Sequence, residues 1–228
     1  MQVPANKLAE FITAQTPERR ERLVRQVKQG GLRHPIYYQC FHSPTKEFLI
    51  GGATDAAGIL RAIEELKGRT ATKWYETDSR ITSNALKALI ALSPRVHGMR
   101  AEFVPTGKSA ALLKVGDVKV SVRPNLFVHG TCNGKPLVGA LRFYLAKESP
   151  FQLGVRRAEL VATMQYLWLA QIATGTRTLD PEHCVVVECI QQRLTTAPAD
   201  PTGHVATIER GCRDFVAMWH RLDAEEAA

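Results

Sequence analysis

Hydrophobic side chains recur at helical spacing through the first part of the chain. This spacing predicts helices over residues 6–14, 17–29, 54–67 and 83–92. The second helix has Thr16 as its N-cap and Pro17 as its first helical residue, and Gly30–Gly31 ends it. Ser93–Pro94 is expected to end the fourth helix, because the residue before a proline disfavours helical geometry.

Alternation of apolar and polar residues then replaces the helical spacing. It predicts strands over residues 102–104, 112–115, 118–122 and 137–146. Residues 126–128 are expected to continue the strand 118–122 past Pro124. Gly116–Asp117 and Asn133–Gly134 suit tight hairpin turns. A helix over 156–173, a strand over 183–191 and a helix over 203–222 complete the predicted elements.

This order of elements predicts an α/β (α+β) fold with a mixed central β-sheet flanked by helices. We predict that residues 1–82 form a helical N-terminal extension. Residues 83–228 are predicted to form an α/β core with a C-terminal helix. The two parts are expected either to stand apart or to pack as one compact domain.

Two predicted strands place polar residues on one face each. Strand alternation puts Lys119, Ser121 and Arg123 together, and Asn125 joins them if the strand continues regularly. On the later strand, Ala140, Arg142 and Tyr144 share the face opposite Leu141 and Phe143. We therefore expect a polar strip that lines a cleft between the sheet and its helices. It consists of Arg123, Asn125, Arg142 and Tyr144.

The segment VKVSVRPNLFV…NGKPLVGALRFYLAK resembles the central hairpin of the PD-(D/E)XK nuclease superfamily. The order helix, three strands, helix, strand over residues 83–198 is similar to that family's core. In the family, an Asp follows Pro on the second strand, and an acidic residue and a Lys, one residue apart, follow on the third. The carboxylates hold Mg²⁺, and the Lys helps to position the attacking water.

This sequence departs from the family pattern at each of these positions. Asn125, Ala140 and Arg142 stand where the Asp, the acidic residue and the Lys would be. The resemblance therefore implies the fold and a nucleic-acid partner, with neither catalytic residues nor metal ligands. The helix RRAELVATMQYLWLAQ resembles one in RecB-like members, where a Gln and a Tyr approach the site. This implies a nucleic-acid contact for Gln165, whereas Tyr166 is better explained as a core residue.

Charge and cysteine content bear on the kind of partner and on the cellular location of the protein. The chain carries 30 Lys and Arg against 22 Asp and Glu, a net charge of +8, which favours polyanionic partners. A basic ridge is expected on the helix 17–29, where cations recur at a spacing of three residues. The five cysteines form no C-x-x-C pair, and no apolar run is long enough to cross a membrane. These features predict a cytoplasmic protein that has reduced thiols and makes no membrane contact.

We therefore predict a non-catalytic nucleic-acid-binding subunit of a larger DNA- or RNA-processing or defence complex, with protein partners and no cofactor. The predicted nucleic-acid contacts are Arg19, Arg22, Arg25, Lys28, Lys119, Arg123, Asn125, Arg142, Lys147 and Gln165. One alternative is an active Mg²⁺-dependent nuclease whose ligands have moved to other positions. Those positions are Asp117, Lys147, Glu159 and Glu188. Another alternative is a protein-interaction subunit that makes no nucleic-acid contact.

Overall fold

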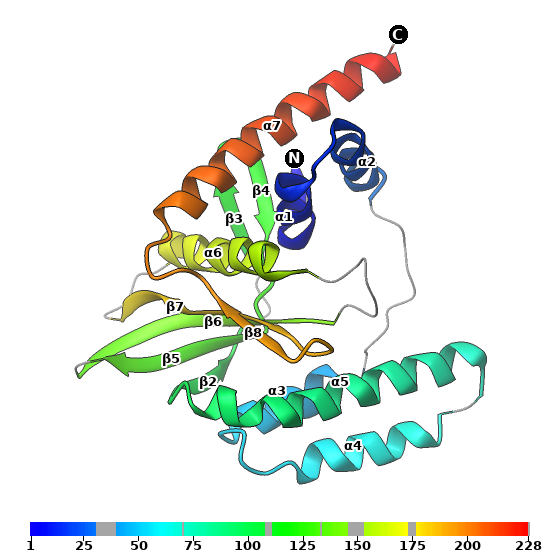
Figure 1. Cartoon of the computed structure of the whole chain (residues 1–228), viewed down its shortest axis with the longest axis vertical. Coiled ribbons are helices and arrows are strands. Elements are labelled where there is room, and N and C mark those ends of the chain that lie inside the picture. The colour runs from blue at the N-terminus through cyan, green and yellow to red at the C-terminus, as the bar shows by residue number, and fades with distance from the viewer. Residues whose placement is uncertain are drawn as a thin grey trace.

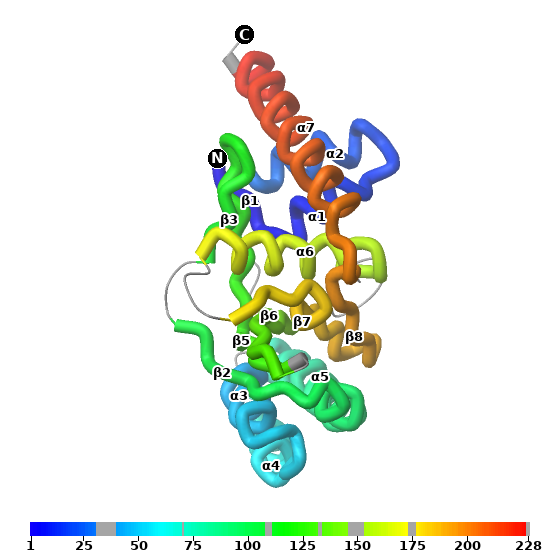
Figure 2. Tube along the Cα trace, turned by 90° about the vertical axis from the view of Figure 1, so that its left-hand side faces the viewer, coloured from blue at the N-terminus to red at the C-terminus, as the bar shows by residue number. Residues whose placement is uncertain are grey.

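The chain folds into a stack of layers with a five-stranded sheet near its middle (Figures 1 and 2). The computed structural model describes residues 1–30, 40–69, 71–107, 111–132, 134–145, 153–172 and 177–227. The helices are α1 (Ala5–Thr13), α2 (Pro17–Lys28), α3 (His42–Ile50), α4 (Ala57–Lys67), α5 (Lys73–His97), α6 (Val155–Ile172) and α7 (Thr202–Ala227). The strands are β1 (Gln2–Pro4), β2 (Glu102–Pro105), β3 (Leu112–Val115), β4 (Val118–Ser121), β5 (Leu126–Cys132), β6 (Lys135–Tyr144), β7 (Thr178–Glu188) and β8 (Arg193–Thr196).

The larger sheet has the strand order β2-β5-β6-β7-β8. β6 and β7 are parallel, and the other neighbours are antiparallel. A parallel pair needs a long crossover connection, and α6 supplies it between β6 and β7. The sheet is therefore mixed and the fold is α+β.

A second sheet of three strands, in the order β1-β4-β3, lies on the far side of α6 from the larger sheet (Figure 2). β3 and β4 form an antiparallel hairpin, and β1 pairs with β4 in parallel. The turn between β3 and β4 contains Gly116, whose φ of 54° lies in the left-handed region that glycine adopts without strain.

Hydrophobic cores lie on both faces of the larger sheet. Helices α3, α4 and α5 cover one face, and their apolar residues pack on Leu126, Leu141 and Val185. Helix α6 covers the other face, and α1, α7 and the three-stranded sheet pack above it (Figure 1). Helix α5 crosses the predicted boundary between residues 82 and 83, and β1 pairs with β4. Residues from both sides of that boundary therefore share both cores.

Several sequence predictions are confirmed. Thr16 caps α2, since its hydroxyl accepts from the backbone N–H of Arg19 at 3.3 Å, and Pro17 is the first helical residue. The β3–β4 hairpin turns at Gly116–Asp117 as predicted.

The helix predicted to end at Ser93–Pro94 was wrong at both ends, because α5 runs from Lys73 to His97. Pro94 cannot donate a backbone hydrogen bond to the carbonyl of Ile90, and the hydroxyl of Ser93 donates to that oxygen instead at 2.7 Å.

The prediction of one strand running through Pro124 was also wrong. Arg123 has a φ of 48°, so the chain leaves β4 in a left-handed conformation. It then enters β5, which belongs to the other sheet. The predictions also lacked β1, α3 and β8, which are all short elements.

Candidate nucleic-acid interface

Asn125 lies directly before β5, and its side chain forms a hydrogen bond within the larger sheet. Its side-chain Oδ1 accepts from the backbone N–H of Phe143 at 2.8 Å, and its own N–H donates to the carbonyl of Leu141 at 2.8 Å. The amide thus extends the β5–β6 ladder by one further hydrogen bond. The oxygen that a metal would need is already used within the protein.

Ala140, Arg142 and Tyr144 share one face of β6, as the alternation predicted. Ala140 is fully buried in the core beneath α6. The guanidinium of Arg142 donates through Nη1 to the carbonyl of Val122. Burial lowers the pKa of Arg142 to about 10, so the side chain is charged at neutral pH, and burial raises the pKa of Tyr144. An engaged amide, an alanine and a cation do not fit Mg²⁺, which requires oxygen ligands.

The predicted strip is therefore divided between the interior and the surface. Arg142 and Tyr144 are half-buried, whereas Arg123 is exposed on the three-stranded sheet. The Nε of Arg123 donates to the hydroxyl of the buried Ser121 at 3.0 Å, which holds its side chain against the end of β4. Lys119 is exposed on the same strand, two residues before Ser121.

Lys114 on β3 completes this surface. Lys114 is the direct cross-strand partner of Lys119. The side-chain amide of Gln171 binds both the N–H and the C=O of Lys114, at 3.0 and 2.7 Å. The backbone groups of Lys114 therefore point away from β4, which makes Lys114 and Lys119 a non-hydrogen-bonded pair, the kind with the closer side chains. We call Lys114, Lys119 and Arg123 the cationic face.

The cationic face has an unbalanced charge. Within the described part of the chain, none of its three cations forms an ion pair with an acidic side chain. Like charges directly opposite each other in a sheet are destabilising. The described strand residues that share the face are Gln2, Pro4, Leu112 and Ser121, none of which is aromatic. Such a surface suits a polyanion backbone rather than stacked bases.

The predicted basic ridge on α2 is largely occupied by acidic side chains. Arg19 pairs with Glu10 of α1. Two others pair with acids near the C-terminus of α7: Arg25 lies 3.3 Å from Glu225, and Lys28 lies 2.8 Å from Asp223. Arg22 is exposed and has no ion pair among the described residues. The helix is present as predicted, but most of its charge is already paired.

The other predicted contacts lie elsewhere. Gln165 is fully buried, and its Nε2 donates to the carbonyl of Val185 at 3.1 Å, so its side chain does not reach the surface where nucleic acid would bind. It hydrogen-bonds α6 to β7 instead. Lys147 lies outside the described residues. Lys114 was absent from the predicted set, although the predicted turn at Gly116–Asp117 already placed it opposite Lys119.

The acids considered as relocated metal ligands lie in separate places. Glu188 is fully buried at the end of β7, where it accepts from the Leu153 N–H at 3.0 Å and from Arg193 Nε at 2.6 Å. Glu159 on α6 lies 3.4 Å from His204, and Asp117 is exposed in the β3–β4 turn. Among the described residues, no three His, Cys, Asp or Glu side chains form a group that could hold a metal ion.

Comparison with known proteins gives no relative: no family model, curated protein or solved structure matches the chain. No helix in the described ranges is both long and apolar enough to cross a membrane. The topology and the surface chemistry of the chain are therefore the observations that bear on its function.

Proposed function

We propose that this protein is a non-catalytic nucleic-acid-binding subunit with a nuclease-like core, which holds a phosphate backbone on its cationic face. The observation that carries the proposal is the cross-strand pair Lys114–Lys119 beside Arg123, three cations with no acidic partner among the described residues. Such an arrangement costs stability unless an anion is bound to it. Phosphate is the anion that a nucleic acid supplies at regular spacing.

The topology supports a nuclease-like core. Apart from the inserted hairpin β3–β4, which belongs to the other sheet, α5 precedes the antiparallel strands β2, β5 and β6, and α6 then crosses over to the parallel strand β7. This is the order that the resemblance to the PD-(D/E)XK superfamily implies. Asn125, Ala140 and Arg142 hold no carboxylate where that family holds its metal, so binding without cleavage is the function these residues favour.

Phosphate contacts carry no base information, so we expect binding with little sequence preference and a strong dependence on salt. The test is fluorescence anisotropy of a labelled mixed-sequence duplex, titrated with protein over a series of salt concentrations. Each cation that neutralises a phosphate contributes about 0.9 to the slope of log affinity against log salt. The variant K114Q/K119Q/R123Q should therefore lose up to about 2.7 of that slope.

A matched control separates the cationic face from net charge. The variant R61Q/R80Q/K87Q removes three exposed cations from α4 and α5, on the opposite side of the larger sheet. It changes the net charge equally and should keep most of the slope. Equal losses in the two variants, or binding that is independent of salt, would refute the proposed interface. RNA duplex and single strands assayed in parallel identify the preferred nucleic acid.

A cleavage assay tests the absence of catalysis. We expect labelled DNA and RNA to remain intact when they are incubated with the protein and Mg²⁺ or Mn²⁺. Cleavage that disappears in Glu159→Ala or Glu188→Ala would overturn the non-catalytic assignment. Because Glu188 is buried and accepts hydrogen bonds from the chain that enters α6, its variant must first be shown to fold, by circular dichroism.

A further inference from the structure

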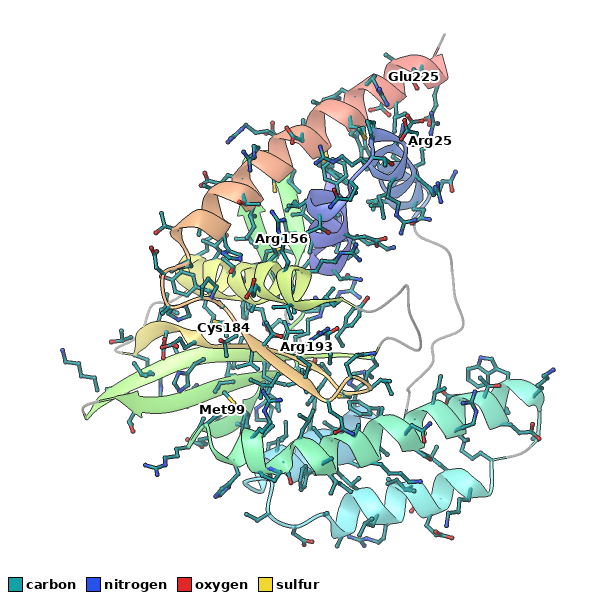
Figure 3. All side chains as sticks on the ribbon, in the orientation of Figure 1. Arg25, Met99, Arg156, Cys184, Arg193 and Glu225 are labelled. Atoms are coloured by element: carbon teal, nitrogen blue, oxygen red, sulfur yellow. The ribbon has the colours of Figure 1, made fainter. Side chains whose placement is uncertain are left out.

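The acidic end of α7 lies against the basic ridge of α2. We define the acidic end as Asp223, Glu225 and Glu226, and the basic ridge as Arg22, Arg25 and Lys28. Figure 3 shows Arg25 and Glu225 close together where α2 and α7 meet, far from the larger sheet. The chain separates these two residues by 200 positions, so the contact is made only by the fold.

Carboxylates of α7 contact two cations of the ridge, Arg25 and Lys28. Arg25 lies 3.3 Å from Glu225 and 3.5 Å from Glu226. Lys28 Nζ lies 2.8 Å from Asp223 and 2.8 Å from Glu226. The hydrogen bonds to Asp223 and Glu226 raise the pKa of Lys28. Arg25 and Lys28 thus each meet two carboxylates of α7, much as they would meet the oxygens of neighbouring phosphates.

Two more charged residues belong to the same cluster. Glu21 of α2 contacts Arg25 at 3.0 Å and Arg221 of α7 at 2.8 Å. Arg221 also reaches Glu225 at 3.5 Å. The hydrogen bond from Arg25 lowers the pKa of Glu21, with Arg221 acting in the same direction. The cluster holds three cations, Arg25, Lys28 and Arg221, against four acids, so it presents no excess positive charge to an incoming polyanion.

These ion pairs are not what holds the two helices together. Asp223, Glu225 and Glu226 are each about half exposed and Arg25 is 40% exposed, so the pairs of Arg25 contribute little to stability, whereas the side chain of Lys28 is only 12% exposed. The apolar residues Leu23, Val24 and Leu222 of the same two helices are buried in the hydrophobic core on the α6 side of the larger sheet. The acidic end can therefore leave the ridge without unpacking α7.

We propose that the basic ridge of α2 is a second phosphate-binding surface, and that the acidic end of α7 covers it as an internal competitor for nucleic acid. The inference rests on the proposed function, since it assumes that the partner is a nucleic acid. In the free protein the carboxylates occupy the positions of phosphates. A nucleic acid must displace them before it contacts Arg25 and Lys28, so these two cations add little to binding in the natural chain.

The test is the variant D223N/E225Q/E226Q, which keeps the shape of the acidic end and removes its charge. The anisotropy assay with the labelled duplex compares it with the natural chain over the same salt series. With the α7 acids neutral, Arg25, Lys28 and Arg221 face Glu21 alone, so the salt slope should steepen by up to about 1.8 and binding should tighten at least about tenfold at low salt. Adding R25Q/K28Q to this variant should remove both gains, because the freed cations are then absent.

A second control makes the same change in net charge as D223N/E225Q/E226Q. The variant E182Q/E209Q/D214N neutralises three exposed acids that make no ion pair in the described part of the chain. Its gain in affinity and in salt slope should be much smaller than that of D223N/E225Q/E226Q. An equal gain in the two variants, or a gain that survives R25Q/K28Q, would overturn the competitor role.

The outcomes also separate this inference from the proposed function. If the natural chain binds through the cationic face but D223N/E225Q/E226Q binds no more tightly, only the competitor role fails. If neither protein binds nucleic acid at low salt, the proposed function fails together with this inference. Thermal unfolding of each variant shows whether it is folded before its affinity is interpreted.

Discussion

Two glycines of the larger sheet, Gly130 and Gly139, pack closely against His183 on β7, and the atoms that each one faces give a prediction. A methyl group added at Gly139 of β6 would overlap the backbone carbonyl carbon and oxygen of His183. A methyl group added at Gly130 of β5 would instead lie 2.5 Å from the imidazole Nε2 of the same residue. One glycine faces fixed backbone, whereas the other faces a ring that can rotate.

The two alanine substitutions should therefore differ in cost. For Gly139→Ala, the parallel pair β6–β7 must move apart where its register already shifts between Val138 and Ala140. We expect a loss of about 3 kcal/mol or more, at or above the upper end for overpacking. For Gly130→Ala, the ring turns aside and weakens its 2.5 Å contact with Asp180, which should cost about 1–2 kcal/mol.

Removing the imidazole distinguishes the two cases. In the His183→Ala background, Gly130→Ala should cost almost nothing further, since its obstacle is gone. Gly139→Ala should cost nearly as much as before, because the carbonyl of residue 183 remains. Urea unfolding followed by far-UV circular dichroism gives the free energies for both double-mutant cycles. Rescue of Gly139→Ala by His183→Ala, or a neutral Gly139→Ala, would refute the packing described for β6 and β7.

Three further predictions concern charge and thiols. Lys119→Gln should raise the free energy of unfolding in urea by about 0.2–1 kcal/mol, because it removes the repulsion with Lys114, and it should also weaken nucleic-acid binding. Lys87→Gln should change neither quantity. A destabilised Lys119→Gln would argue against cross-strand repulsion. Glu188→Gln should cost about 2–3 kcal/mol, because it leaves Arg193 without its buried carboxylate, and an unfolding midpoint like that of the natural chain would contradict this. Cys184 should resist a thiol reagent at about pH 8 until the protein unfolds, because burial raises its pKa to about 12; mass spectrometry identifies the labelled site.

Local signals in the sequence predicted much of the secondary structure. The capping pattern at Thr16–Pro17 and the turn at Gly116–Asp117 act over a few residues, and both are confirmed. The end of α5 was missed because Ser93 satisfies the carbonyl that Pro94 leaves open, a compensation that residue preferences do not contain. The break at Arg123 was missed because a left-handed conformation is uncommon for a side chain of that size.

The candidate site was harder to predict, since it depends on contacts between distant residues. The alternation correctly placed Arg142 and Tyr144 on one face of β6, yet it could not show that α6 covers that face. Arg25 looked free to bind phosphate because its carboxylate partners lie 200 residues away in the chain. Lys119 and Arg123 stay exposed as expected, and the hairpin register adds Lys114 to them.

The contact between Gln171 and Lys114 also bears on how this chain meets other copies of itself. β3 is the last strand of its sheet, and an open strand edge is a template for pairing with another chain. The Gln171 amide occupies the donor and the acceptor of Lys114 together, as a neighbouring strand would do. A single side chain on α6 thus closes the middle of this edge, and the charge of Lys114 repels an identical strand that approaches it. Resistance to aggregation at this edge therefore depends on the Gln171 amide and the Lys114 charge together, and loss of the amide would leave an open strand edge beside the surface proposed to bind nucleic acid.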